Sequence, residues 1–234
     1  ETLALASDML QNPAFNPSDI ERVRRNTQNA ILTERDDLKQ TADKVFRKVL
    51  FGDQYLGSWS RGSNETVESL TREDLVWWHS YQWRLSNAGL VVVSGLPKDV
   101  ILKSLNRAFG AAINHSKAVP VPEAPKPRGA HDSKAIYWVQ KDGASQSVVM
   151  LGNIAPAFDP ARSTAQQAGN SVLGGQFTSR VNMNLREDKG YTYGARSAVN
   201  THRHGGYYRA SASVKANTTA ASLTEFLKEF DGIT

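Results

Sequence analysis

A proline-rich segment at residues 119–128 is the feature that most constrains how this chain folds. It reads VPVPEAPKPR, with four prolines in ten residues. Proline lacks a backbone N–H and fixes φ, so neither a helix nor a central strand continues through such a segment, and an extended connector is favoured. We therefore predict a first domain at residues 1–118, a linker at 119–132 and a second domain at 133–234.

Composition excludes several classes of protein. The chain has 234 residues, of which 40% are hydrophobic and 22% charged, enough to bury a sizeable core. Its longest apolar run, LVVV at 90–93, is far shorter than the ~20 residues needed to cross a bilayer, so we expect no membrane span. The net charge is +5, but basic and acidic residues alternate along the predicted helices and no nucleic-acid motif accompanies them. We expect no nucleic-acid partner.

The chain contains no cysteine, which excludes disulfides and cysteine zinc sites. This fits the cytoplasm, the periplasm or an organelle equally well. We expect the periplasm, with the cytoplasm as the alternative. Residues 2–10 already have the pattern of an amphipathic helix, so we expect the chain to begin inside a fold, with any export signal upstream.

Before the proline-rich segment the pattern is mostly helical. Asn12-Pro13 ends a first helix, and apolar residues then recur at helical spacing from Pro17 to near Leu38. A further helix is predicted at 42–50, and Thr71 is a good N-cap for another. A buried strand at 88–95 and a crossover helix at 97–109 complete this half.

After the proline-rich segment, strands and helices alternate. Apolar periodicity predicts strands at 135–139, 146–151, 191–199 and 207–214, and helices at 160–173 and 218–230. The predicted class is α+β. Neither half resembles a complete domain by itself.

An aromatic cluster in the first half has two interpretations. It consists of Trp77, Trp78, Tyr81 and Trp83. The residues could form a peptide-binding surface, but their helical spacing favours a core seam with one exposed edge.

The most informative stretch for function runs from residue 173 to residue 194. Residues 173–180 read LGGQFTSR and residues 185–194 read LREDKGYTYG. Together they combine a glycine pair, a short amphipathic helix and a Gly/Tyr-rich entry into a strand. Arg186 and Tyr193 lie seven positions apart across the end of that helix.

This stretch resembles the Arg/Tyr signature in the second domain of the pitrilysin/insulinase-type (M16) zinc metallopeptidases. Weaker matches follow in the family's order, at residues 10–15 (LQNPAF), 50–53 (LFGD), 70–75 (LTREDL) and 87–93 (NAGLVVV). The resemblance implies the back half of one and the front half of a second homologous α/β sandwich domain. In that family two such domains form a clamshell that closes over a peptide.

In the family, the arginine and tyrosine project into the cavity and contact the substrate backbone, roles that the resemblance assigns to Arg186 and Tyr193. Guanidinium and phenol both donate hydrogen bonds to a carbonyl oxygen and bind its tetrahedral oxyanion more strongly than the ground state. The alternative is a solvated helix arginine and an inward-packed strand aromatic. Because the surrounding signature is in register, we favour the functional interpretation.

The other signature residues are interpreted as scaffold. Gly174 and Gly175 supply a turn closed to side chains, Phe177 is expected in the core, and Arg180 is expected to pair with an acidic neighbour or cap carbonyls.

The family's zinc motif, His-x-x-Glu-His, is not in this sequence. No histidine has a partner four residues away with a glutamate between them; the histidines are His79, His115, His131, His202 and His204. The pair His202 and His204 is interpreted as a surface loop rather than a metal site. The family's third ligand, a glutamate, aligns with Gln28 here, or with Glu34 if the alignment shifts. We therefore expect no metal or cofactor bound by this chain, with zinc in a catalytic partner or an upstream segment.

The resemblance thus implies a part in a zinc-dependent metalloendopeptidase system, from a non-catalytic bacterial member. The chain would supply substrate-binding and oxyanion-stabilising residues, and would be inactive alone. Its expected partners are a peptide substrate and either a zinc-bearing homologous subunit or a second copy. The alternative function is that of a non-catalytic structural or interaction subunit with the same fold.

Overall fold

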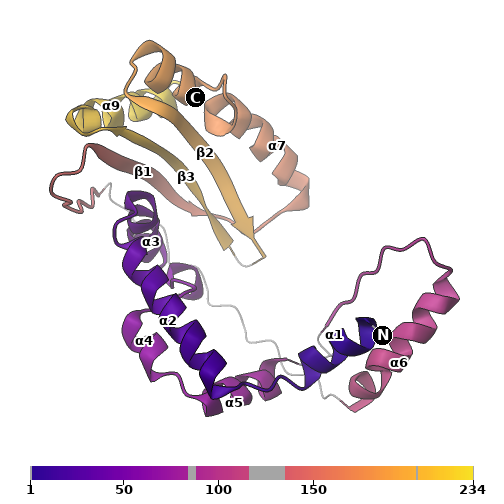
Figure 1. Cartoon of the computed structure of the whole chain (residues 1–234). Helices are drawn as coiled ribbons and strands as arrows, with labels where there is room; N and C mark the ends of the chain where they lie inside the picture. Colours follow the sequence, from indigo (N-terminus) through magenta and orange to yellow (C-terminus); the bar gives the residue numbers. More distant parts are fainter. Residues whose placement is uncertain (1, 84–87, 116–134, 204, 234) are drawn as a thin grey trace. The chain divides into compact units, whose positions relative to one another are not determined.

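The structure, a computed structural model, describes residues 2–83, 88–115, 135–203 and 205–233 (Figure 1). At residues 111–115 it describes the backbone only. The chain forms two compact units. One comprises residues 1–30 and 63–123, and the other residues 31–62 and 124–234. The predicted linker at 119–132 lies outside the described residues, so the predicted domain division stays a prediction.

The first unit is built from helices. They are α1 (Thr2–Gln11), α2 (Pro17–Glu34, whose last turn lies in the other unit), α4 (Asn64–Ser69), α5 (Arg72–Gln82) and α6 (Lys98–His115). The predicted cap at Thr71 is confirmed, because its hydroxyl accepts the Asp74 amide while the Asp74 carboxylate accepts the Thr71 amide. No helix of the described residues is long and apolar enough to cross a membrane.

The predicted buried strand at 88–95 is wrong. The segment pairs with no strand, and Val91 and Val93 are 89% and 96% exposed. A strand requires a neighbour whose backbone completes its hydrogen bonds, and the described residues of this unit contain no second strand. The apolar run favours a strand, but the described residues of this unit offer no neighbouring strand to pair with it.

The favoured core interpretation of the aromatic cluster is also wrong. Trp77, Trp78, Tyr81 and Trp83 are all more than 40% exposed, and α5 buries none of its residues. Trp77 and Tyr81 stack on each other with ring centroids 5.4 Å apart. Helical spacing correctly placed Trp77 and Tyr81 beside each other, but all four rings are exposed rather than packed in a core.

The second unit is built on a three-stranded antiparallel sheet in the order β1-β3-β2. Its strands are β1 (Gln146–Ala155), β2 (Thr192–His202) and β3 (Gly205–Lys215), so the strands predicted at 146–151, 191–199 and 207–214 are confirmed. The strand predicted at 135–139 is wrong: these residues pair with no strand, and Ile136 is 80% exposed. The α+β class is confirmed.

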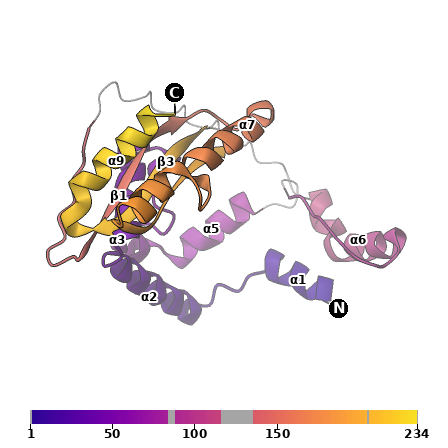
Figure 2. The ribbon, with the colours of Figure 1, turned by 90° about the horizontal axis from the view of Figure 1, so that it is seen from above.

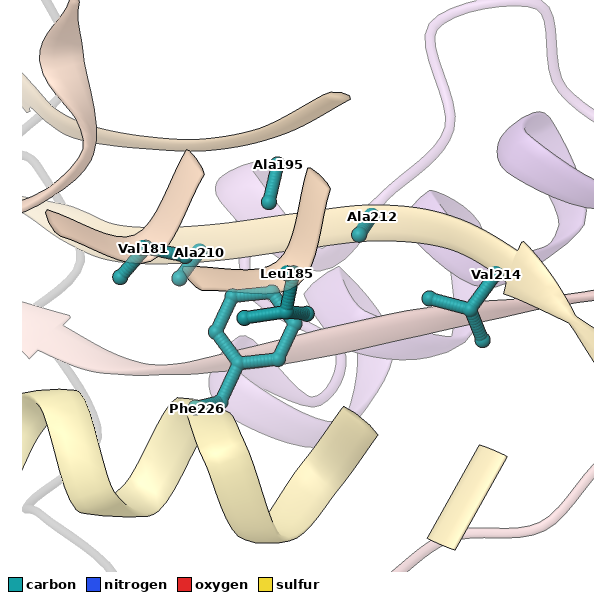
Figure 3. Close-up of a cluster of buried hydrophobic side chains, with 7 residues drawn as sticks. All are labelled: Val181, Leu185, Ala195, Ala210, Ala212, Val214 and Phe226. Atoms are coloured by element: carbon teal, nitrogen blue, oxygen red, sulfur yellow. The ribbon is translucent and has the colours of Figure 1, made fainter. Parts of the chain in front are cut away.

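The central strand β3 alternates between two faces. Ala210, Ala212 and Val214 face the helix α9 (Thr219–Asp231), where Phe226 packs against them. Figure 3 shows the Phe226 ring directed from α9 toward Leu185 and the alanines of the sheet. These residues belong to one cluster of buried side chains, in which Val181, Leu185, Val214 and Phe226 are fully shielded from solvent.

The opposite face of β3 packs against α3 (Leu38–Phe51). Tyr207 contacts Leu50 and Phe51 there, and Arg209 donates to Asp43 at 2.5 Å. Figures 1 and 2 show α3 on one side of the sheet and α9 on the other.

Two helix boundaries differ from prediction for one reason. Asp37 accepts hydrogen bonds from the amides of Lys39 and Gln40, and so caps a new helix. The helix α2 therefore ends at Glu34 rather than near Leu38, and α3 begins at Leu38 rather than at 42.

Candidate functional site

The signature stretch begins where α7 (Pro160–Asn170) continues into a π-helical turn, η3 (Ser171–Gly175). Gly174 lies against β2: a Cβ on it would be 2.3 Å from the Ser197 Oγ, so only glycine fits. The Asn170 amide donates to the Ser197 carbonyl at 2.9 Å and accepts from its hydroxyl at 2.6 Å. These contacts fix the turn to the strand and confirm the interpretation of Gly174 as closed to side chains.

Arg186 lies on a second π-helical turn, η4 (Met183–Asp188), which follows the short helix α8 (Arg180–Asn182). Turns of this type are frequent at functional sites. The side chain is 38% exposed, its Nε lies 3.2 Å from the Glu187 carboxylate, and its guanidinium carbon is 4.5 Å from the centre of the Phe177 ring. Within the described residues, no hydrogen bond from its terminal NH₂ groups to a protein group is found.

The sequence predicted Phe177 in the core, but the residue is 51% exposed. Its ring is an open surface on which the guanidinium rests. Arg180 behaves as predicted, because it pairs with Glu229 at 2.9 Å and donates to the Gly232 carbonyl at the end of α9.

A β-bulge directs Tyr193 to solvent. Thr192 pairs with Val214 and Ala195 with Ala212, so β2 has one residue more than β3 between these pairs. In unbroken alternation Tyr193 would share the core face of Ala195; the extra residue instead leaves it 89% exposed. The inward-packed alternative for Tyr193 is therefore excluded.

The Thr192 hydroxyl fixes the bulge. It lies 2.6 Å from the Ser213 carbonyl and 3.0 Å from the Gly194 carbonyl, and it accepts the Gly194 amide at 3.1 Å. One side chain thus forms hydrogen bonds with backbone groups of both strands at the point where the pairing of β2 with β3 is irregular.

Arg186 and Tyr193 emerge beside the same core. Leu185, just before Arg186, and Ala195, two residues after Tyr193, are both fully buried in the cluster of Figure 3. Between them Gly190 adopts φ +62°, a left-handed conformation suited to glycine, and its amide donates to the Arg186 carbonyl. That the two side chains meet at one substrate carbonyl stays a prediction.

Two buried asparagines in this stretch were missed by the sequence reasoning. Asn182, 4% exposed, donates to the Phe177 carbonyl at 2.6 Å and accepts the Ala195 amide at 3.0 Å. Asn184 is 7% exposed. The sequence offers one signal for Asn182: it is a polar residue beside the apolar positions Val181 and Leu185.

Asn184 connects η4 to α9 through two carboxylates. Its amide nitrogen lies 2.8 Å from Glu225 and 2.7 Å from Glu229. The hydrogen bond from Asn184 lowers the pKa of Glu225. Burial raises the pKa of Glu229, but the hydrogen bonds from Asn184 and Arg180 outweigh it, and the net pKa is lowered.

We expect acid to weaken this connection. Both carboxyls have folded pKa values below their ordinary 4.5, so their stabilising contribution is complete above that pH and is lost as pH falls through the folded pKa. The free energy of unfolding, measured in urea between about pH 6 and pH 3, should therefore fall toward acid. In Asn184→Ala the fall should be shallower; a slope equal to that of the unchanged protein would show that the network does not contribute.

The candidate zinc ligands do not suit a metal. Gln28 offers an amide whose nitrogen donates to Glu68 at 2.6 Å. Glu34, 4% exposed, already accepts Lys44, Trp59 and Arg61 at 2.6, 3.0 and 2.6 Å; burial raises the pKa of this carboxyl, but these donors lower it overall. These three donors occupy most of the acceptor positions of the carboxylate, so Glu34 is engaged in contacts within the protein. In the described part of the chain, no three His, Cys, Asp or Glu residues are grouped as a metal site requires.

Two curated proteins are similar in sequence to this chain. The chain is 25% identical over 195 residues to an uncharacterized zinc protease of Mycobacterium leprae, covering 83% of this chain and 43% of that protein. It is 24% identical to a non-peptidase homolog of Helicobacter pylori, covering 98% of this chain and 53% of that protein. The chain therefore spans about half the length of these curated relatives.

Solved structures share the fold. The peptidase M16 inactive domain from Pseudomonas fluorescens superposes with a TM-score of 0.84 at 19% identity, covering 99% of this chain and 55% of that one. Pitrilysin superposes with a TM-score of 0.63 at 15% identity, covering 98% of this chain and 25% of that one. The family model described as the peptidase M16 inactive domain matches residues 69–234, well over half of the sequence. The chain thus belongs to the M16 peptidase family and carries its inactive domain.

Proposed function

We propose that this chain supplies substrate-binding and oxyanion-stabilising groups to a zinc-dependent metalloendopeptidase that degrades or processes peptides. Arg186 and Tyr193 are the residues that carry this role. The zinc belongs to a homologous subunit or to another segment of the same assembly, since Gln28 and Glu34 are engaged in other contacts.

The observation that supports the proposal most strongly is the bulge at Thr192–Gly194. It turns a large aromatic side chain, 89% exposed, away from a core that would otherwise bury it. Exposing a tyrosine in this way has no benefit for packing, and bulges that redirect one side chain are common beside active sites. Arg186, with terminal donors that bind no protein group of the described chain, emerges beside the same core.

The chemistry of the two groups suits an acyl-transfer transition state. Each presents a donor to a peptide carbonyl oxygen, and the Arg186 guanidinium also carries a permanent positive charge. As the carbonyl oxygen gains negative charge, both hydrogen bonds strengthen, so the transition state is stabilised more than the substrate.

A second candidate function has its own support. The Helicobacter pylori relative, which matches 98% of this chain, is described as a non-peptidase homolog. A structural or interaction subunit would keep the fold and have no need of two exposed donors beside one core. The retained pair Arg186 and Tyr193 favours the peptidase role.

The two functions are separated by partner capture followed by an activity assay. The tagged chain is purified from native extract with whatever binds it, and cleavage of a quenched-fluorescent peptide library is measured with and without a zinc chelator. Chelator-sensitive cleavage by the captured assembly, absent from the chain alone, supports the peptidase role. An assembly that cleaves nothing supports the structural subunit.

A further inference from the structure

We infer that Asn182 is a positioning residue for the Arg186 and Tyr193 side chains, an inference that rests on the function proposed above. Asn182 is the last residue of α8 and is 4% exposed. Its amide nitrogen donates to the Phe177 carbonyl, and its amide oxygen accepts the Ala195 N–H. One buried side chain thus connects the segment under Arg186 with the strand that carries Tyr193.

The surroundings of Asn182 make both hydrogen bonds necessary. Its neighbours Val181, Leu185 and Ala195 are fully buried and apolar. A polar amide in such surroundings is stable only while its donor and its acceptor are both paired. The two bonds, at 2.6 and 3.0 Å, therefore hold the Phe177 segment and β2 at a fixed separation.

At one end, this connection fixes the position of the Arg186 side chain. The guanidinium has an ion pair with Glu187, but both side chains are more than a third exposed, and exposed pairs orient a side chain weakly. Its other contact is the face of Phe177, where a cation is attracted to the ring. Since Asn182 holds the Phe177 carbonyl, it also sets where that ring lies.

At the other end, the connection fixes the position of the Tyr193 backbone. The Ala195 amide bonded to Asn182 is the first regular pairing position after the bulge. The Thr192 hydroxyl closes the bulge on its other side. Tyr193 is held between these two fixed points, although its own ring is exposed.

The inference predicts a specific effect on catalysis. A displacement of about 1 Å of a group that binds the transition state costs up to ~100-fold in rate. Replacing Asn182 should therefore lower kcat by about 10- to 100-fold and change KM less, because ground-state contacts tolerate misplacement better.

The test uses three variants of the intact chain. Asn182→Leu removes both hydrogen bonds and keeps the number of side-chain heavy atoms and their branching. Asn182→Asp keeps an acceptor for Ala195 but, when ionised, has no donor for Phe177. Phe177→Leu removes the ring beneath Arg186 at an exposed position, where folding is not at risk.

NMR provides a readout that does not depend on activity. In the unchanged protein, the Phe177 ring current should shift the Arg186 side-chain protons upfield, and Phe177→Leu should abolish the shift. Both Asn182 variants should lose most of it. Asn182→Asp should leave the Tyr193 ring signals in place, whereas Asn182→Leu should move them.

A matched control separates positioning from general destabilisation. Asn184 is also a buried asparagine in this helical stretch, but its amide reaches Glu225 and Glu229 on α9 instead. Asn184→Leu should lower stability while the Arg186 shift and kcat are retained.

The outcomes distinguish this inference from the proposed function. If the assembly cleaves peptides and both Asn182 variants retain the Arg186 shift and kcat, the positioning role is overturned. If the assembly cleaves nothing, the proposed peptidase function fails, and the NMR shifts still decide whether Asn182 orients Arg186. Loss of the shift together with loss of kcat supports both.

Discussion

Replacing Arg186 with alanine is expected to lower the kcat of the assembled peptidase by about 100- to 1000-fold, with a smaller change in KM. Removing one donor to an oxyanion costs on the order of 2.7–4 kcal/mol of transition-state stabilisation, and Arg186 contributes charge as well as hydrogen bonds. Tyr193→Phe, which removes only the hydroxyl, should lower kcat by ~100-fold. Steady-state cleavage of a quenched-fluorescent peptide by the captured assembly measures both values.

Two exposed residues serve as matched controls for this experiment. Arg162 has a side chain that is 76% exposed on α7, and Tyr55 is 79% exposed. Arg162→Ala and Tyr55→Phe should leave kcat unchanged. Near-normal kcat for both Arg186→Ala and Tyr193→Phe, in an assembly still inhibited by a zinc chelator, would refute the proposed role of the pair.

Replacing Phe226 with alanine is expected to lower the free energy of unfolding by about 3–5 kcal/mol. Its side chain is fully buried where α9 meets the sheet, and its ring lies 6.1 Å from that of Phe230. The cavity left behind would be lined by Leu185 and Val214, which are held by the backbone of η4 and β3 and cannot move far to fill it. Urea unfolding followed by circular dichroism gives the difference.

Phe158 provides the comparison for that substitution. It is 51% exposed, so Phe158→Ala should change the unfolding free energy by no more than about 0.5 kcal/mol. Similar losses for the two variants would mean that the cluster around Phe226 is not the centre of this unit.

Capping chemistry and apolar periodicity predicted several elements correctly. The cap at Thr71, the helix at 218–230 and the strands at 146–151, 191–199 and 207–214 are each confirmed. The strands expected at 88–95 and 135–139 failed because pairing depends on a neighbouring backbone, which no local pattern specifies.

The candidate site was predictable in identity but not in geometry. Arg186 and Tyr193 were chosen from a signature, and the structure adds the reason why Tyr193 is accessible. The bulge depends on register against β3, so it could not be read from β2 alone. Phe177 and Asn182 were misplaced or missed because residue type suggests a core position for the first and a surface position for the second.

The strand order β1-β3-β2 has a consequence for self-association. Within the described residues, both β1 and β2 have one side without a neighbouring strand. The bulge makes the pairing of β2 with β3 irregular, whereas β1 pairs with β3 regularly along all ten residues and contains the apolar run 148–151. A regular strand with apolar side chains at the edge of a sheet is a template for strands from other molecules. Fibrillar aggregates of this chain should therefore grow from the β1 side.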